Sequence, residues 1–184
     1  MSTPSPARDR VLETATRLFY AEGIHAVGVD RIVTEAGVTR ATFYRHFPSK
    51  EELVRSYVQA WDQEVRDEVA AVVPGLGADQ ALELFLARLG EEMCRPGFRG
   101  CPFINAAAEY PDQDNPVARA IASHRTWLRE TFALLLGELG VPEPYQRAAL
   151  LMLLRDGAMV GAALGEPAAV AGQLAVAVRE LVRR

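Results

Sequence analysis

The amino-acid sequence predicts an all-α protein, and three observations lead to this prediction. Apolar residues recur at helical spacing along nearly the whole chain of 184 residues, and no run alternates as a strand would. Glycine, proline and capping residues separate these apolar runs. Apolar residues make up 49% of the chain, which is enough for a sizeable core. We therefore expect nine helices.

The first three predicted helices are closely spaced. Pro6 fits the first position of a helix, and Gly23 can end that helix. Gly37 can adopt the positive φ of a tight turn after the second helix. Thr39 can cap the third helix, which Pro48 ends. These helices are predicted at 6–22, 29–36 and 40–47.

A longer fourth helix is predicted to join two domains. Ser49 and Glu52 have the spacing of a capping box, so a helix is expected over about 49–73. We expect a helix-turn-helix domain over 1–50 and a larger helical domain over 51–184. Later helices are predicted at about 82–93, 103–110, 116–139, 145–164 and 168–182.

The charge is divided unevenly along the chain. The protein carries a net charge of −4, whereas residues 1–60 carry +1 and the remainder −5. Residues 37–50 contain several bases and no acid, so this segment is the candidate for contact with a polyanion.

Several other classes of protein are disfavoured. The sequence contains no glycine-rich phosphate loop, nucleophile elbow or metal-ligand spacing, so we expect neither an enzyme nor a cofactor or metal. The longest apolar stretch is shorter than a membrane span and is interrupted by Arg155 and Asp156, which favours a cytoplasmic protein. Cys94 and Cys101 are expected to be free thiols, although oxidation could bring them together.

Two short helices joined by Ala36-Gly37-Val38 fit a helix-turn-helix unit. Phe43 and Phe47 are expected to face inward, which leaves the polar residues of the second helix exposed. Such a helix enters the major groove of DNA with its N-terminal residues on base edges. The predicted DNA-binding residues are Thr39, Arg40, Ala41, Thr42, Tyr44, Arg45, His46 and Lys50.

These residues suit different parts of the duplex. Arg40 can pair with guanine, and the methyl group of Ala41 can contact thymine. Thr42, Tyr44 and His46 suit phosphate oxygens, and Lys50 stands at a helix start, which favours anions. The alternative interpretation is a basic but merely solvated helix face.

The stretch 29–53 resembles the DNA-binding domain of the tetracycline-repressor-like (TetR) family, most clearly over Ala36-Gly37-Val38-Thr39-Arg40-Ala41-Thr42-Phe43-Tyr44-Arg45-His46-Phe47-Pro48-Ser49-Lys50-Glu51-Glu52-Leu53. The resemblance covers about the first 60 residues. The sequence departs from the family pattern at two positions. Val33 stands where a small alanine is usual, and Gly28 stands where a capping Thr or Ser is usual. It implies a homodimeric repressor, bound to a palindromic DNA operator, that a small molecule in the C-terminal domain releases. The fourth helix would then be the lever between ligand and DNA.

The last two helices are candidates for dimerisation. The stretch 150–154 is apolar on all sides, and two glycines four residues apart permit close helix approach. The predicted dimer residues are Leu153, Gly157, Val160, Gly161, Leu174 and Val178. Alternatively, both faces of the eighth helix are buried inside one subunit.

A ligand pocket is predicted between the fifth and eighth helices. Its candidate residues are Met93, Phe98, Phe103, Asn105, Glu109, His124, Trp127 and Met152. The same residue types at helical spacing can equally form ordinary core. A mostly apolar pocket would take an apolar or weakly polar effector. The competing hypotheses for the whole chain are a helical protein-interaction module and a small enzyme without DNA binding.

Overall fold

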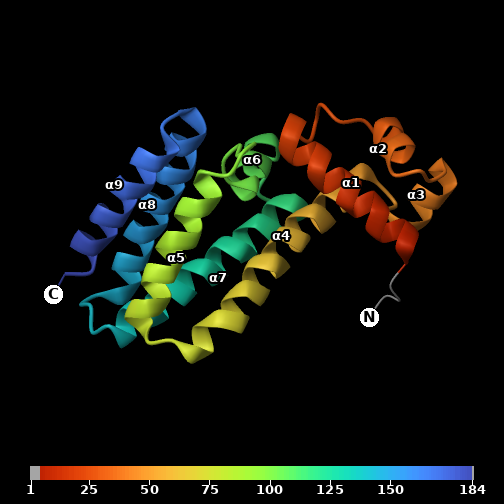
Figure 1. Cartoon of the computed structure of the whole chain (residues 1–184). Helices are drawn as coiled ribbons and strands as arrows, with labels where there is room; N and C mark the ends of the chain where they lie inside the picture. The colour runs from red at the N-terminus through yellow and green to blue at the C-terminus, as the bar shows by residue number, and fades with distance from the viewer. Residues whose placement is uncertain (1–4, 184) are drawn as a thin grey trace.

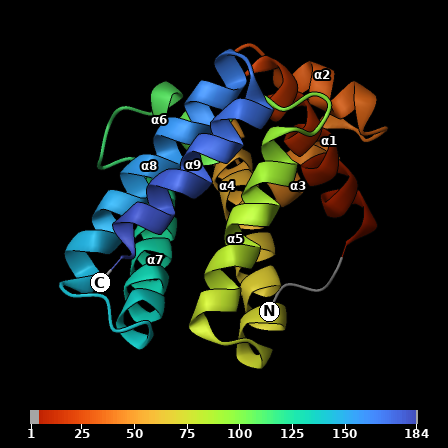
Figure 2. The ribbon, with the colours of Figure 1, turned by 60° about the vertical axis from the view of Figure 1, so that its left-hand side comes forward.

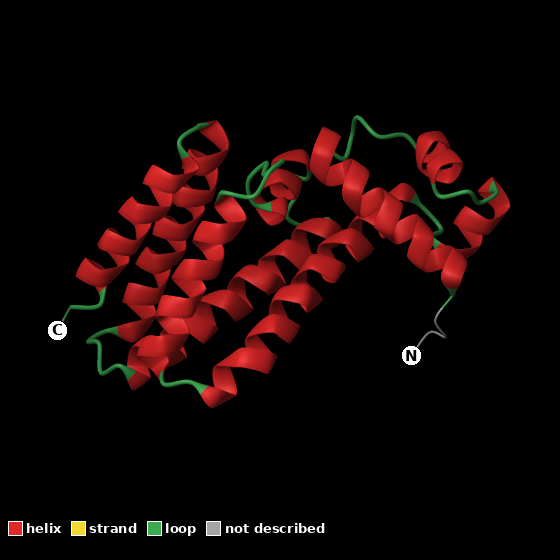
Figure 3. Ribbon diagram, viewed as in Figure 1, coloured by secondary structure: helices red, strands yellow, loops and turns green. Residues whose placement is uncertain are grey.

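The computed structural model describes residues 5–183, and within this range the chain forms nine α-helices, a 3-10 turn and loops, without strands (Figure 3). This confirms the predicted all-α class.

The N-terminal unit comprises α1 (Pro6–Glu22), α2 (Val29–Glu35) and α3 (Arg40–His46), which lie together at one end of the molecule (Figure 1).

The three N-terminal helices enclose one end of a continuous apolar core. Leu18 of α1, Ile32 of α2 and Phe43 of α3 are all buried there. The turn between α2 and α3 passes through Gly37, whose φ of 62° is the left-handed value that favours glycine. α3 therefore lies against α1 with one face in the core and the other in solvent.

Helix α4 (Lys50–Val72) connects the two ends of the molecule, and the 3-10 turn Val73–Gly75 follows it (Figure 1). Its start forms only half of the predicted capping box. The Ser49 hydroxyl accepts a hydrogen bond from the Glu52 N–H at 3.1 Å. The Glu52 carboxylate does not complete the box, because it accepts from Arg55 Nη2 at 2.5 Å instead.

The C-terminal unit contains five more helices, which continue the same apolar core. α8 packs against both α7 and α9, and α5 packs against α9 (Figures 1 and 2). None of the described helices is long and apolar enough to cross a membrane. The helices are α5 (Ala78–Met93), α6 (Pro102–Glu109), α7 (Pro116–Glu138), α8 (Pro144–Leu164) and α9 (Pro167–Leu181).

Candidate functional site

Helix α3 is held at the surface by a cap and by aromatic anchors. The Thr39 hydroxyl accepts a hydrogen bond from the Thr42 N–H at 3.1 Å, which satisfies one free donor of the first turn. Phe43 and Phe47 are buried with their ring centroids 6.0 Å apart. These contacts fix which face of α3 meets solvent.

The predicted DNA-binding residues lie on this solvent-facing side of the unit. Thr39, Arg40, Ala41, Tyr44 and Arg45 are exposed. The remaining three, Thr42, His46 and Lys50, are half-buried. Six of the eight residues lie on α3, Thr39 is the N-cap of that helix, and Lys50 is the first residue of α4.

The two arginines of α3 differ in their surroundings. Arg40 Nε lies 3.0 Å from Asp30 Oδ1, and both side chains are mostly exposed. Arg45 forms no ion pair within the part of the chain that the structure describes. An exposed pair such as Arg40–Asp30 contributes about 0–1 kcal/mol, so Arg40 can exchange Asp30 for a base edge at little cost.

Lys50 is more enclosed than a solvated surface lysine. Its Nζ lies 5.9 Å from the centroid of the Phe19 ring. Burial lowers the pKa of Lys50 below its ordinary value, and the nearby Glu109 carboxylate opposes that shift. The side chain therefore leaves the start of α4 with its ammonium group directed toward the Phe19 ring of α1.

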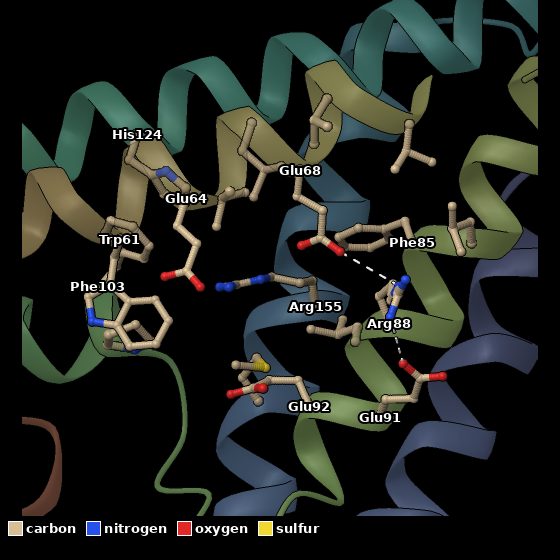
Figure 4. A pocket seen from close by; sticks show the side chains of 18 of the residues that line it. Trp61, Glu64, Glu68, Phe85, Arg88, Glu91, Glu92, Phe103, His124 and Arg155 are labelled. Carbon is tan, nitrogen blue, oxygen red and sulfur yellow. Dashed lines mark hydrogen bonds and ion pairs between the residues drawn. The ribbon is translucent and has the colours of Figure 1, made fainter. Parts of the chain in front are cut away.

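A cavity of about 580 Å³ lies in the C-terminal unit and opens to solvent (Figure 4). Its wall from α4 follows one helix face, since Trp61, Glu64, Val65 and Glu68 recur at spacings of three and four. The other walls come from the turn after α4 and from α5, α6, α7 and α8. Arg95, in the loop after α5, also lines the cavity. The further lining residues are Val69, Val72, Val73, Ala81, Leu84, Phe85, Arg88, Leu89, Glu91, Glu92, Arg95, Pro102, Phe103, His124, Leu128, Arg155 and Met159.

The lining of the cavity is mostly apolar, as the sequence suggested, and charged side chains are added to it. Figure 4 shows Glu64, Glu92 and Arg155 directed into it from three helices. Arg155 is buried, and its Nη1 donates to Asp156 Oδ1 at 2.9 Å. Both of its terminal nitrogens also lie 3.3 Å from Cys101 Sγ.

His124 closes part of the inner wall. Its ring stacks on Phe103 with centroids 3.7 Å apart, and its Nδ1 lies 2.8 Å from Asp62 Oδ1. The carboxylate is an acceptor, so Nδ1 carries the proton. Burial lowers the pKa of His124, and the contact with Asp62 offsets only part of this shift.

Two of the eight predicted pocket residues, Phe103 and His124, line the cavity. Met93 and Met152 are buried in the apolar core instead. Trp127 lies outside the lining, with the guanidinium carbon of Arg66 4.3 Å from the centroid of its ring.

Phe98, Asn105 and Glu109 also lie outside the cavity lining. Phe98 belongs to the α5–α6 loop and packs against the core, and Asn105 Nδ2 donates to the Arg99 carbonyl at 2.9 Å. Glu109 is occupied elsewhere, because its carboxylate accepts hydrogen bonds from the loop after α1.

Sequence reasoning missed Trp61, Glu64, Phe85 and Arg155. A signal for the first two existed in the apolar and acidic residues on one face of α4. That pattern is equally typical of a helix that is half-buried in a core. Arg155 gave a clearer signal, since it interrupts an apolar run.

Helix α6 connects the cavity to the N-terminal unit. Its first residues, Pro102 and Phe103, line the cavity. At its other end, the Glu109 carboxylate accepts from the backbone N–H groups of Ile24 and His25, at 2.7 and 2.5 Å. We call this contact the Glu109 clamp.

Further contacts join the same two units. The Tyr20 hydroxyl donates to the Gly100 carbonyl at 3.1 Å and accepts from the Arg99 N–H at 2.9 Å. Asn115 Nδ2 donates to Glu51 Oε2 at 2.8 Å. The loop before α6 therefore contacts α1, and the residue before α7 contacts the first turn of α4.

Helix α8 carries an exposed apolar stripe. Leu153 is 67% exposed and Leu164 84% exposed. Gly157 lies between them along the stripe, and a Cβ atom added there would meet nothing within 4 Å. The stripe consists of Leu150, Leu153, Gly157, Val160 and Leu164 on α8, and Val176 of α9 is exposed as well.

The other predicted dimer residues lie inside the subunit. Leu174 and Val178 are buried, which corrects their assignment to a surface between subunits. The reason is that α9 turns them toward the core between α5 and α8. A Cβ added at Gly161 would lie 3.6 Å from Val170, so this glycine serves the packing of α8 on α9 within one chain.

The described residues contain no group of side chains suited to a metal ion. Cys94 is exposed and Cys101 buried, and both are free thiols.

A family model described as bacterial regulatory proteins of the tetR family matches residues 11–57. The crystal structure of SCO4454, a TetR-family transcriptional regulator from Streptomyces coelicolor, is similar with a TM-score of 0.92. The two chains share 43% sequence identity, over 97% of this chain and 95% of that one.

Two regulators from Bacillus subtilis are also similar. The HTH-type transcriptional regulator LmrA is 27% identical over 125 residues, which are 66% of this chain and 66% of LmrA. The uncharacterized HTH-type regulator YxaF is 43% identical over 54 residues, or 29% of this chain and 28% of YxaF. The matches thus span two thirds or less of these two proteins. All these relatives are named as transcriptional regulators, which supports the prediction that the chain is not an enzyme.

Proposed function

This chain belongs to the TetR family of bacterial regulatory proteins, and on that premise we propose that it represses transcription as a homodimer whose operator binding a small effector abolishes. The observation that carries the proposal is α3, a capped helix whose buried aromatic anchors leave Arg40, Tyr44 and Arg45 exposed.

The proposed contacts with DNA are those predicted from the sequence. Arg40 and Ala41 read base edges, and Thr39, Thr42, Tyr44, Arg45 and His46 surround them with phosphate and edge contacts. Lys50 and the free N–H groups at the start of α4 bind a phosphate. Access to the chromosome requires a cytoplasmic location. We place the boundary between the DNA-binding and effector-binding domains within α4, near residue 50.

The exposed stripe on α8 supports the homodimer. Contiguous apolar side chains on a soluble surface mark an interaction site, and two copies of one stripe form a closed two-fold interface. A two-fold dimer presents two copies of α3. They fit a palindromic operator when they enter major grooves about 34–36 Å apart, or a near multiple of that distance.

The cavity walls supply the link between effector and operator. α4 begins at Lys50 and lines the cavity from Trp61 onward, while α6 runs from the cavity to the Glu109 clamp. A ligand that prefers one arrangement of these helices shifts the spacing of the two α3 helices. Typical coupling of this kind amounts to about 1–3 kcal/mol.

The experiment is selection of bound fragments from the native genome, followed by titration of a recovered fragment at several salt concentrations. We expect a preference for a palindromic site and an affinity that falls steeply with salt. Recovery of no preferred fragment, together with salt-independent binding, would contradict the proposal and favour a protein-interaction module. Added effectors are then tested for release of the recovered fragment.

A further inference from the structure

The charged lining of the cavity has an unbalanced acid. Four acids and three arginines line it, namely Glu64, Glu68, Glu91 and Glu92 against Arg88, Arg95 and Arg155. Each arginine is already paired: Arg88 with Glu68 and Glu91, Arg95 with Glu92, and Arg155 with Asp156. Glu64 forms no ion pair with any base among residues 5–183.

A neighbouring carboxylate adds to this imbalance. Burial raises the pKa of Glu92, against the effect of Arg95, and the Glu64 carboxylate raises it further. Figure 4 shows the Glu64 and Glu92 carboxylates directed into the cavity from α4 and α5, and Arg155, which is paired with Asp156, directed into it from α8. A cation placed between them would relieve their repulsion, whereas an anion would increase it.

Aromatic side chains lie next to Glu64. Trp61 precedes it by one helical turn on the same face of α4. Phe103, fixed by its stack on His124, and Phe85 provide further rings in the lining. Aromatic faces bind organic cations through their quadrupoles, and partial exclusion of water strengthens that attraction.

We infer that the cavity binds an organic cation with an aromatic body, whose positive group lies between Glu64 and Glu92 and whose rings contact Trp61 and Phe103. This inference rests on the proposed function, because it names the chemical class of the effector. It differs from the apolar or weakly polar effector expected from the sequence in that the ligand carries a positive charge. The volume of about 580 Å³ suits a ligand of two rings or more.

Three probes that share one biphenyl body separate the contribution of charge from that of shape. They are (biphenyl-4-ylmethyl)trimethylammonium, biphenyl-4-methanol and biphenyl-4-acetate. Calorimetric titration of the full-length protein should show the cation binding at least about tenfold more tightly than the alcohol, and the acetate more weakly still. Equal or tighter binding of the alcohol or the acetate, or no binding of the cation, overturns the inference.

Glu64→Gln tests the residue that carries the argument. Glu64 is exposed, so the variant should keep the helical circular dichroism of the parent. We expect it to lose at least about fivefold in affinity for the cation and to bind the alcohol unchanged. Glu91→Gln is the matched control, because Glu91 lies on the same lining but is paired with Arg88. An unchanged affinity of Glu64→Gln for the cation would refute the assignment.

Trp61 reports where the probe binds. The chain contains two tryptophans, and Trp127 lies outside the lining, so Trp127→Phe leaves only the indole at the cavity. The emission of this variant should change on addition of the cation, and an unchanged emission at saturation would place the probe elsewhere.

Operator binding without any ligand is measured separately. Its absence would contradict the proposed function, whereas a wrong order among the probes contradicts only the class of ligand.

Discussion

Arg40 and Lys50 are both proposed contacts with DNA, but the protein holds their charges in different ways. Arg40 extends toward Asp30 in an exposed ion pair. Lys50 lies along the Phe19 ring, where burial opposes its charge. The first residue is therefore free to move toward a base, whereas the second is held in place for a phosphate.

Lys50→Ala should weaken binding to all DNA sequences alike. The lost phosphate contact should reduce the slope of log K against log salt concentration by about one unit. Fluorescence anisotropy with the operator and with a scrambled duplex measures both effects. Tyr44→Phe removes a hydroxyl but no charge, and should weaken binding without changing the slope. A Lys50→Ala slope equal to that of the parent would show that Lys50 does not contact phosphate.

Arg40→Ala should instead relax the preference for one base pair, by about 1–3 kcal/mol of discrimination. Affinities for single-base variants of the operator measure this change.

Asp30→Asn should instead increase the affinity for the operator, since it releases Arg40 and removes a negative charge near the duplex. We expect tighter operator binding by a few fold at low salt, with the gain shrinking as salt rises. Affinities for single-base variants of the operator distinguish the two substitutions, and an operator affinity reduced by Asp30→Asn would refute this role of the pair.

His124 should make the protein less stable in mild acid. Its pKa in the folded state is lowered from an ordinary value of 6.5, so its contribution is present above pH 6.5 and is lost as the pH falls toward the folded-state pKa. The loss is at most about 1.4 kcal/mol for each pH unit. Thermal melting at pH 7.5 and 5.5 should therefore show a larger drop for the parent than for His124→Gln, which keeps a donor for Asp62 but cannot titrate. Equal drops would mean that other groups account for the acid sensitivity.

At the scale of elements, the Glu109 clamp makes α6 the mechanical link that the sequence did not suggest. Its carboxylate is the acceptor for two successive backbone N–H groups of the loop after α1. Movement at Phe103, on the cavity, must therefore act on that loop through a single short helix. The fourth helix, which the sequence suggested as the lever, shares this task.

Glu109→Ala should loosen the loop between α1 and α2. Removal of the acceptor should cost about 1–3 kcal/mol of stability and speed hydrogen exchange at the amides of 24–25. Bound effector should then release the operator less completely, although its affinity for the cavity is unchanged. Glu51→Ala is the control, since it removes a carboxylate in the first turn of α4 whose contact is with one half-buried side chain, Asn115. Full release by the effector in Glu109→Ala would show that coupling bypasses α6.

The limits of nearly all the helices were predictable because local chemistry sets them. Thr39 and Asn115 accept hydrogen bonds from the first turns of the helices they cap, and Pro116 occupies a position where no backbone donor is needed. The cavity was not predictable in this way. Leu53 and Trp61 both occupy the apolar side of α4, yet one lies in the core and the other faces the cavity. The environments of these two residues differ because of the distance between α4 and α5 in space, which local sequence does not determine.

For the molecule as a whole, the exposed stripe on α8 is the feature that one subunit leaves unexplained. The sequence located it only in part, because 150–154 is apolar on every side and nothing local tells which side meets α9. Leu151 and Met152 face the core, and Leu150 and Leu153 face solvent. The division is set by packing between helices that are distant in the chain.

Gly157→Glu tests the dimer without disturbing the subunit. A side chain at this position meets no atom of its own chain within 4 Å, so the subunit should fold normally. In a closed interface the new charge would lose its hydration, so we expect sedimentation to show a folded monomer with weakened operator binding. Gly75→Glu, in the exposed turn after α4, makes the same change away from the stripe and should remain dimeric. A dimeric Gly157→Glu protein, or a monomeric parent at micromolar concentration, would contradict the interface.

Lys50 is the only lysine in the sequence, and this gives the proposed DNA surface a chemical label of its own. Because burial lowers its pKa, a larger fraction of its amine is uncharged near neutral pH than in an ordinary lysine, and the uncharged amine is the form that reacts with acylating reagents. A single mass shift on the peptide that contains it would therefore report whether the surface is covered. Protection by DNA, and its reversal by an effector, could be followed in a mixture of proteins without purification, mutation or an attached fluorophore.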